Sequence, residues 1–352
     1  MNRAMHTQCR IGLWARVGAL VACIAAGAAS ARAWNYPGHR MVNQVALAAL
    51  PPDFPAWIRT PEVKDRITYL AGEPDRWRDT WLQPLQQYNA LDHFIDLEEV
   101  PAAGISYDSL TPFLYDFVVR FAEGRAAHLG NFLPIDPAYD RDHTREWCGF
   151  LPWSIYEYYA KIQEDFSILR TFETQGGTPV EIENTKEDII YEMGVMGHFV
   201  GDGSQPLHTT VQFNGWVGPN PNGFTRSTRF HAWIDGGFIA KAGITVDELL
   251  PNVKVAEPLD VAPRPDGRDP VFVAIMDYLL AGNKLVVPLY ELEKEHKLEG
   301  DDPGSAEGRA FIDAQLLRGG EMLSALWLTA WRHPTPCHYL QFELAERQGG
   351  TP

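Results

Sequence analysis

Helical periodicity runs through most of the chain and limits its fold more than any other feature of the sequence. Apolar residues recur at the three- and four-residue spacing of a buried helix face in the segments 39–50, 107–129, 151–172, 181–199, 270–292 and 306–331. Asp269 and Pro270 are typical of an N-cap followed by a first-turn proline. No segment shows the alternation expected of a half-buried strand. The sequence therefore predicts an all-α fold.

Two irregular segments interrupt the helical pattern. Residues 214–227 are dense in Gly, Asn and Pro, and residues 251–269 are rich in Pro, so neither is expected to be regular helix. Neither separates stretches with clearly independent cores, and the chain is long enough to bury one sizeable core. We therefore expect a single globular helical domain over 34–345, followed by a C-terminal tail over 346–352.

The first 33 residues have the pattern of a secretory signal. Three arginines precede a short apolar run over 17–29, and a small-x-small cleavage site follows at 31–33. Cleavage there would make Trp34 the first residue of a secreted or periplasmic protein. A lipoprotein-like box ending at Cys23 offers an alternative that would keep Trp34 inside the chain. The short apolar run between Arg16 and Cys23 favours the later site.

The charge of the chain is strongly negative. The formal net charge is −16, and loss of the four arginines in the leader brings it to about −20. Such a surface repels nucleic acid and anionic membranes at long range, which counts against a basic-groove binding protein. A phosphate-cleaving enzyme stays possible if bound metal supplies the positive charge. No segment after the leader is expected to span a membrane.

Cysteine usage leaves the redox state open. Cys148 and Cys337 are the two cysteines outside the leader. One disulfide in an oxidising compartment and two buried free thiols are both consistent with the sequence.

Histidine and aspartate recur at spacings typical of metal ligands. His198 and Asp202 are four residues apart, so a helix would present both on one face. Gly201 and Gly203 leave room there for close approach of another backbone, and Pro206 ends the helix. The remaining candidates are His208 in the following turn, His231 and Asp235 at the same four-residue spacing, and Asp75, His93, His39 and the α-amine of Trp34 upstream.

These groups suit zinc. Neutral imidazole nitrogens and carboxylate oxygens are zinc ligands, and an α-amine can also lose its proton near neutral pH. One carboxylate can bridge two ions, and a pair of ions can stabilise the attacking and leaving oxygens of a phosphoryl displacement. A single His-x-x-x-Asp pair is common by chance. The number of such coincidences, in order along the chain, is what indicates a metal centre.

The ordered set resembles the trinuclear-zinc phosphoesterases, a superfamily that joins the single-strand-specific nucleases of fungi and plants to bacterial zinc-dependent phospholipases C. The motifs that carry the resemblance span 34–235. The resemblance implies an all-α fold with three zinc ions at the bottom of a cleft. It implies one ion on Asp75, His93, His198 and Asp202, a second on His39 and the Trp34 amine and carbonyl with Asp202 bridging, and a third on His208, His231 and Asp235.

Three details resemble the nuclease branch. His39 follows Trp34 by five residues, Asp235 stands where phospholipases use Glu, and His231 follows His208 by 23 residues. The nuclease resemblance implies that Arg78 contacts the scissile phosphate. It also implies that Asp96 or Glu98 orients the attacking water, and the choice between them stays open.

The expected substrate is single-stranded DNA or RNA, cleaved by an endonuclease activity, and 3′-nucleotidase activity is a further expectation. Phe94 and the 214–227 loop, including Asn214, are candidates for an aromatic platform and substrate contacts, because single-strand enzymes generally need one. Phe94 could equally be a core residue. We expect a monomer without an obligate protein partner.

Some features depart from the nuclease pattern. An insertion places 104 residues between His93 and His198. Its aromatic segment over 148–159 could cover the cleft. The favoured interpretation is that this segment is an ordinary helix-packing face. Ser204 stands where nucleases more often have His. Two alternatives therefore stay open: a zinc-dependent phospholipase C acting on phospholipid, and a catalytically silent metal-binding protein.

Overall fold

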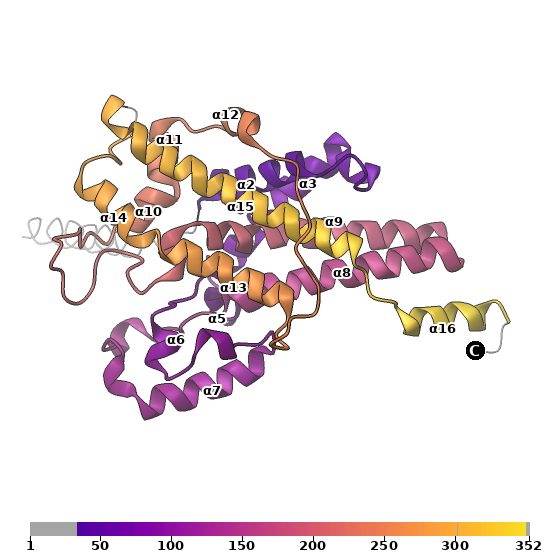
Figure 1. Cartoon of the computed structure of the whole chain (residues 1–352), viewed down its shortest axis with the longest axis horizontal. Helices are drawn as coiled ribbons and strands as arrows, with labels where there is room; N and C mark the ends of the chain where they lie inside the picture. Colours follow the sequence, from indigo (N-terminus) through magenta and orange to yellow (C-terminus); the bar gives the residue numbers. More distant parts are fainter. Residues whose placement is uncertain (1–33, 301, 350–352) are drawn as a thin grey trace, which may run out of the picture. The chain divides into compact units, whose positions relative to one another are not determined.

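Helices make up most of the chain described by the computed structural model, which covers residues 34–300 and 302–349 (Figure 1). The expected signal sequence over 1–33, with Cys23, lies outside these residues. The described part holds no β-strand, only an isolated bridge between Phe213 and Gly215. The described residues form one compact helical unit, so the predicted all-α, single-domain fold is confirmed.

The α-helices of the described part are α2 (Tyr36–Ala49), α3 (Pro61–Leu70), α4 (Glu73–Arg78), α5 (Gln83–Ala90), α6 (Glu99–Ala102), α7 (Leu114–Ala127), α8 (Leu151–Gln175), α9 (Pro179–Ser204), α10 (Phe230–Ala232), α11 (Phe238–Ala242), α12 (Val246–Leu249), α13 (Pro270–Asn283), α14 (Val286–Lys294), α15 (Ala306–Arg332) and α16 (His338–Arg347). Three further elements matter for the site. They are the 3₁₀ turns η2 (Leu91–His93) and η6 (Pro206–Thr209) and the π-helical segment η7 (Trp233–Gly237).

Side-chain caps mark the start of α9 and of α13. Thr178 and Glu181 form a capping box at the start of α9, and Pro179 takes the first helical position. The carboxylate of Asp269 accepts a hydrogen bond from the backbone N–H of Phe272 at 2.8 Å, which confirms the predicted cap of α13. α9 ends just before Pro206, as predicted, so the chain turns sharply after Asp202.

The C-terminal half of α9 runs through the interior. α8 and α9 lie side by side, and α15 packs against α2, α8 and α9 (Figure 1). Every residue from Met193 to Ser204 on α9 is buried. This burial places His198 and Asp202 in the interior of the protein.

Two predicted helical segments are broken in the structure. The 107–129 pattern forms a short 3₁₀ turn and then α7, and the 270–292 pattern divides into α13 and α14 around Lys284. Residues 270–294 together are long and apolar enough to span a membrane by length and composition, which the sequence expectation missed. Half of that window is buried, including Ile275 and Leu279, and α13 packs on α8. These contacts are typical of a core helix.

The insertion between His93 and His198 packs against the core. Trp153 on α8 is buried and stacks on Phe117 of α7, with ring centroids 4.1 Å apart. The favoured interpretation of the aromatic segment as a packing face is therefore confirmed for Trp153. Cys148 is buried, and both Cys148 and Cys337 are free thiols, so they form no disulfide.

Candidate metal centre

Eight of the predicted ligand side chains meet inside the protein. They come from α2, α4, η2, α9, η6, α10 and η7, segments that are distant in sequence. They form three buried or nearly buried groups that could each hold a metal ion: His39, Asp75 and His198; His93, His198 and Asp202; and His208, His231 and Asp235. The first two groups share His198, so they form one continuous cluster.

Asp202 lies at the middle of this cluster. Its side chain is fully buried, and its two oxygens face different histidines. Oδ2 lies 3.1 Å from Nδ1 of His93 and 3.4 Å from Nε2 of His198. Oδ1 lies 3.4 Å from Nε2 of His39 and 3.9 Å from Nδ1 of His208. A carboxylate in this position can contact two ions at once.

Backbone carbonyls fix the tautomers of three histidines. Nδ1 of His198 lies 2.7 Å from the carbonyl oxygen of Ala71, and Nδ1 of His208 lies 2.6 Å from that of His93. Nδ1 of His231 lies 3.1 Å from the carbonyl oxygen of Phe213. A carbonyl can only accept, so each Nδ1 carries the proton and donates it. Each Nε2 then presents a lone pair to the cluster, as in a metal-bound histidine.

These lone pairs point at one another in the third group. Nε2 of His208 and Nε2 of His231 are 3.0 Å apart, and neither carries a proton in the tautomers above. Nε2 of His231 also lies 2.9 Å from Oδ2 of Asp235. The other oxygen, Oδ1, accepts a hydrogen bond from Nε2 of Gln205 at 2.7 Å. Once Asp235 is ionised, these three acceptor atoms have no proton to share and suit a cation between them.

Other buried polar atoms of the centre also lack a hydrogen-bond partner among the described residues. Among the described residues, no hydrogen bond reaches either ring nitrogen of His39, Nε2 of His93, Oδ1 of Asp202 or Oδ2 of Asp235. Buried polar atoms are normally paired, because an unpaired one costs free energy. The donor set and its unpaired atoms therefore fit metal ions.

Burial keeps the histidines neutral. Desolvation is the main cause that lowers the pKa of His198, His208 and His231 to about 3. The pKa values of His39 and His93 are also lowered well below the ordinary value, again mainly by burial. The positive charge of Arg78 adds to the lowering at all five. Neutral imidazole is the form that binds metal.

Burial acts on the carboxyl groups in the opposite direction. It is the largest cause that raises the pKa of Asp202 and of Asp235 well above the ordinary value. The anionic forms of these two groups are therefore unfavourable in the protein by itself. A cation bound between them would offset this cost, because a bound ion is the largest local charge in such a site.

Gly201 allows α2 to approach α9 closely. A Cβ at this position would lie 2.8 Å from Nδ1 of His39. The His39 ring stacks on the His198 ring, with centroids 3.8 Å apart and an angle of 20° between the planes. The sequence predicted close approach of a backbone at Gly201, whereas the close neighbour is the side chain of His39, which lies at the centre.

Trp34 and Ser204 pack beside the centre. The Trp34 side chain is fully buried, and its Nε1–H donates to Oγ of Ser204 at 2.9 Å. Ser204 in turn donates to the carbonyl of Gly201. The next residue, Asn35, donates its backbone N–H to the carbonyl of Asp235 at 3.0 Å. These contacts hold the segment that begins at Trp34 close to two of the buried groups. Ligation by its amine stays a prediction.

Arg78, for which the nuclease resemblance implies a contact with the scissile phosphate, pairs with a residue of the centre. Its Nη2 donates to Oδ1 of Asp75 at 2.7 Å, and its Nε lies 3.7 Å from Asp79. Only 12% of its side chain is exposed. Oδ1 of Asp75 also lies 3.9 Å from Nε2 of His198, which connects Arg78 to the buried cluster.

The two acidic candidates after His93 have different surroundings. Both oxygens of Glu98 accept hydrogen bonds, from Oγ1 of Thr210 at 2.6 Å and from the backbone N–H of Val211 at 3.2 Å. Asp96 is half-buried, and its backbone N–H donates to the carbonyl of Cys148. Desolvation, helped by Glu99 and Glu98, raises the pKa of Asp96 well above its ordinary value.

The predicted substrate contacts lie on either side of this segment. Phe94 is half-buried, and its carbonyl accepts from the backbone N–H of Leu151. Asn214 has a buried Oδ1 without a hydrogen-bond partner among the described residues. Its neighbour Phe213 was not predicted, although it orients His231 through its carbonyl and is 38% exposed. A position just before the irregular loop was the only sequence signal for it.

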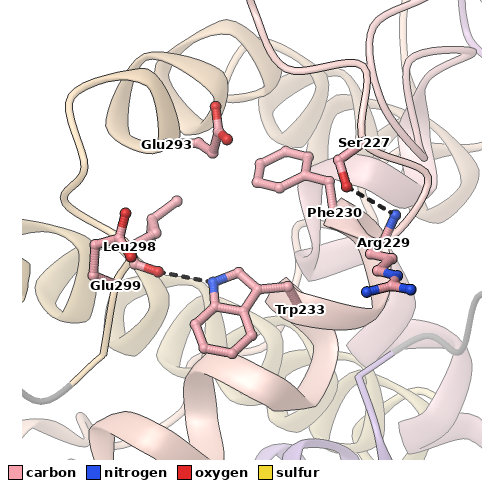
Figure 2. Close-up of a pocket in the computed structure, with 7 residues that line it drawn as sticks. All are labelled: Ser227, Arg229, Phe230, Trp233, Glu293, Leu298 and Glu299. Atoms are coloured by element: carbon pink, nitrogen blue, oxygen red, sulfur yellow. Dashed lines mark hydrogen bonds between the residues drawn. The ribbon is translucent and has the colours of Figure 1, made fainter.

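A separate pocket of about 290 Å³ borders α10 and η7 without including any predicted ligand. Figure 2 shows Phe230 and Trp233 on one side of it, with Glu293 and Glu299 across the space. The Trp233 Nε1–H donates to the carbonyl of Leu298 at 2.8 Å, which ties η7 to the segment after α14. Because Trp233 and Asp235 lie on the same segment η7, we assign the residues of this pocket to support of that segment and not to substrate binding.

One further His/acid group lies on a surface loop. It consists of Asp140, His143 and Glu146, of which only Asp140 is buried. His143 and Glu146 pair with one another at 3.0 Å, and both are exposed. Exposed acidic groups of this kind are common without an ion, so it is not counted with the centre.

Comparison of the chain with models of protein families, with curated proteins and with solved structures found no match. The structure shows an all-helical protein with buried His/Asp groups that could bind metal. Its chemistry therefore has to be argued from these groups.

Proposed function

We propose that the protein is a secreted or periplasmic zinc-dependent phosphoesterase that cleaves phosphodiester bonds in single-stranded DNA or RNA. The observation that carries this proposal is the convergence of unprotonated histidine nitrogens and aspartate oxygens in three adjacent buried groups. Nitrogen and oxygen donors in this mixture suit zinc better than calcium or magnesium, which prefer oxygen alone. The sequence resemblance to trinuclear-zinc nucleases gives the same metal and the same residues.

Bound zinc ions would supply Lewis-acid charge for a phosphoryl oxygen and lower the pKa of water. His93, His198, Asp202 and Asp75 would hold ions in the continuous cluster together with His39 and the Trp34 amine. His208, His231 and Asp235 would hold the third. Backbone carbonyls and Gln205 hold these side chains in place, as outer-shell partners do in metal sites.

Three residues outside the ligand set have separate tasks. We assign Arg78 to the phosphate, because it is the cation paired to Asp75 at the edge of the centre. We assign orientation of the attacking water to Asp96, because both oxygens of Glu98 are used to hold the 210–211 segment. Glu98 is thereby a positioning residue for the loop that follows His208.

The test is cleavage of a labelled single-stranded oligonucleotide by purified, zinc-loaded protein that begins at Trp34. We expect cleavage that a chelator abolishes and zinc restores, and weaker cleavage of the same sequence as a duplex. Arg78→Ala should lower kcat by about a hundredfold, the usual loss for one transition-state donor. Arg332→Ala is the matched control, because Arg332 forms a surface pair with Asp53.

A second candidate is a zinc-dependent phospholipase C, which one observation favours. Trp81 is fully exposed and Leu82 is 60% exposed, three and four residues after Arg78. Exposed Trp is typical of surfaces that meet a lipid interface. Hydrolysis of phosphatidylcholine vesicles without oligonucleotide cleavage, by protein shown to contain zinc, would favour this function. Absence of both activities would leave a metal-binding protein and contradict both enzymes.

A further inference from the structure

A pocket lies between the start of α2 and the start of α4, beside the metal centre. Its volume is about 360 Å³, and it is lined by Tyr36, Gly72, Asp75, Arg76 and Asp79. Asp75 also belongs to the first buried His/Asp group, so the pocket and the centre share one side chain. A ligand in the pocket would therefore lie next to a group bound at the centre. The volume is in the range of small-molecule sites.

Tyr36 gives this pocket an aromatic wall. The residue is 37% exposed, although it stands between the buried Trp34 and the buried His39. Its ring lies against Gly72, where a Cβ would collide with Cδ2 and Cε2 of the ring. Glycine at position 72 thus lets the ring lie on the turn that begins α4. A ring that is held in place and open to solvent can stack on a base.

Two guanidinium groups lie over the same ring. The Cζ atoms of Arg40 and Arg76 lie 5.2 Å and 5.7 Å from the Tyr36 ring centroid. Nη1 of Arg40 also donates to the Tyr36 hydroxyl at 2.9 Å. Arg76 is oriented by hydrogen bonds from Nε and Nη2 to Glu73. The carboxylates of Asp75 and Asp79 also line the pocket, and Arg76 pairs with Glu73, so the net charge of the pocket does not select an anion by itself. The two guanidinium groups over the ring are the groups that can contact a phosphate directly.

We infer that this pocket is a nucleotide subsite, in which Tyr36 stacks on the base next to the scissile phosphate and Arg76 contacts the neighbouring phosphate. The inference rests on the proposed nuclease function and narrows its substrate. In this arrangement the bound strand places one base on Tyr36, on the α2 side of the centre. A duplex cannot present that base without unstacking it, which gives the site a physical reason to prefer single strands.

Binding of adenosine 5′-monophosphate to the zinc-loaded protein tests the subsite without depending on catalysis. We expect calorimetry to give a Kd that rises about tenfold or more in Tyr36→Ala, as for loss of one base–aromatic stack. Tyr36→Phe keeps the ring and should stay within about twofold. Arg76→Gln should weaken binding of the nucleotide and leave binding of adenosine unchanged.

Tyr69→Ala is the matched control for the loss of a ring. Tyr69 is 40% exposed and lies under the same Arg76 guanidinium at 4.5 Å, yet it does not line the pocket. Its removal should leave the Kd unchanged. Zinc content and melting temperature, measured for each variant, identify any variant that loses the fold instead of the subsite.

Three outcomes would overturn the inference: equal Kd values for the wild type and Tyr36→Ala, equal binding of ribose 5-phosphate and the nucleotide, or tighter binding of phosphocholine. The proposed function fails by a different result. Protein that cleaves oligonucleotide but binds the nucleotide independently of Tyr36 loses only the subsite. Protein that binds it through Tyr36 and cleaves nothing keeps the subsite and loses the nuclease.

Discussion

The Nε2 atoms of His208 and His231 face one another at 3.0 Å, while both rings donate their Nδ1–H to backbone carbonyls. Two lone pairs held this close by the backbone repel one another unless a cation lies between them. The arrangement is therefore expensive for the protein alone and favourable for the metal-bound protein.

Metal removal should consequently destabilise the protein. Ligand binding to the folded state alone adds about 4 kcal/mol per site at a thousandfold excess over Kd. We expect a chelator to lower the melting temperature by many degrees and zinc to restore it, as measured by scanning fluorimetry. Chelator saturated with zinc beforehand is the control. An unchanged melting temperature would show that the buried groups hold no ion.

The two buried aspartates should differ in how many ions they hold. Asp235 belongs to one group, whereas the oxygens of Asp202 face His39 and His93 on opposite sides. We expect Asp235→Asn to lose about one zinc per chain and Asp202→Asn to lose more, as measured by mass spectrometry of bound metal. Equal losses in the two variants would contradict a bridging position for Asp202.

Gly201→Ala should disturb the centre although it replaces none of the predicted ligand residues. The added methyl group would lie 2.8 Å from Nδ1 of His39 and would push that ring away from His198. We expect a loss of about 1–3 kcal/mol in the free energy of unfolding, as for other overpacked sites, together with lower zinc content. Gly130→Ala is the control, because a Cβ there meets nothing within 4 Å.

A carboxyl pair between α8 and α9 should make stability depend on pH. Desolvation, with the nearby Asp165 carboxylate, raises the pKa of Glu192 to about 8, and the protonated Glu192 donates to Asp165. The folded state therefore holds a proton that the unfolded state releases near pH 4.5. The contribution of this proton to the free energy of unfolding is fully present below pH 4.5 and is lost as the pH rises towards 8.

Glu192→Gln tests this dependence, because the amide can donate to Asp165 without a titrating proton. We expect the variant to be more stable than the wild type at pH 8 by about 1 kcal/mol, since partial solvation reduces the effect. The difference should shrink at pH 5, as measured by urea unfolding. Glu187→Gln, on the exposed side of the same helix, is the control. A difference that is the same at both pH values would refute the shared proton.

The sequence predicted which side chains meet in the buried groups better than the backbone contacts that support them. His198 and Asp202 follow the four-residue repeat of one helix, so their common face was visible from spacing alone. The carbonyl of Ala71, which orients His198, comes from a residue 127 positions away and requires no particular side chain. A backbone group of this kind leaves no pattern in a sequence.

Local breaks in helices were also beyond the sequence. The apolar pattern of 270–292 continues through the interruption at Lys284, because both α13 and α14 bury one face. The spacing of His231 and Asp235 likewise predicts an α-helix, whereas the chain forms the π-helical segment η7. In this segment Nε1–H of Trp233 donates to the carbonyl of Leu298, 65 positions away, a contact that a local pattern cannot predict.

The distance along the chain between the groups that meet at the centre has a consequence for folding kinetics. His93 and Asp202 are 109 residues apart, and the contact of Asn35 with Asp235 closes a still longer loop. Such non-local contacts are costly to close and tend to form late, after local helices are in place. A zinc ion that needs the closed arrangement would then leave the rate of folding unchanged. It would act almost entirely by slowing the rate of unfolding.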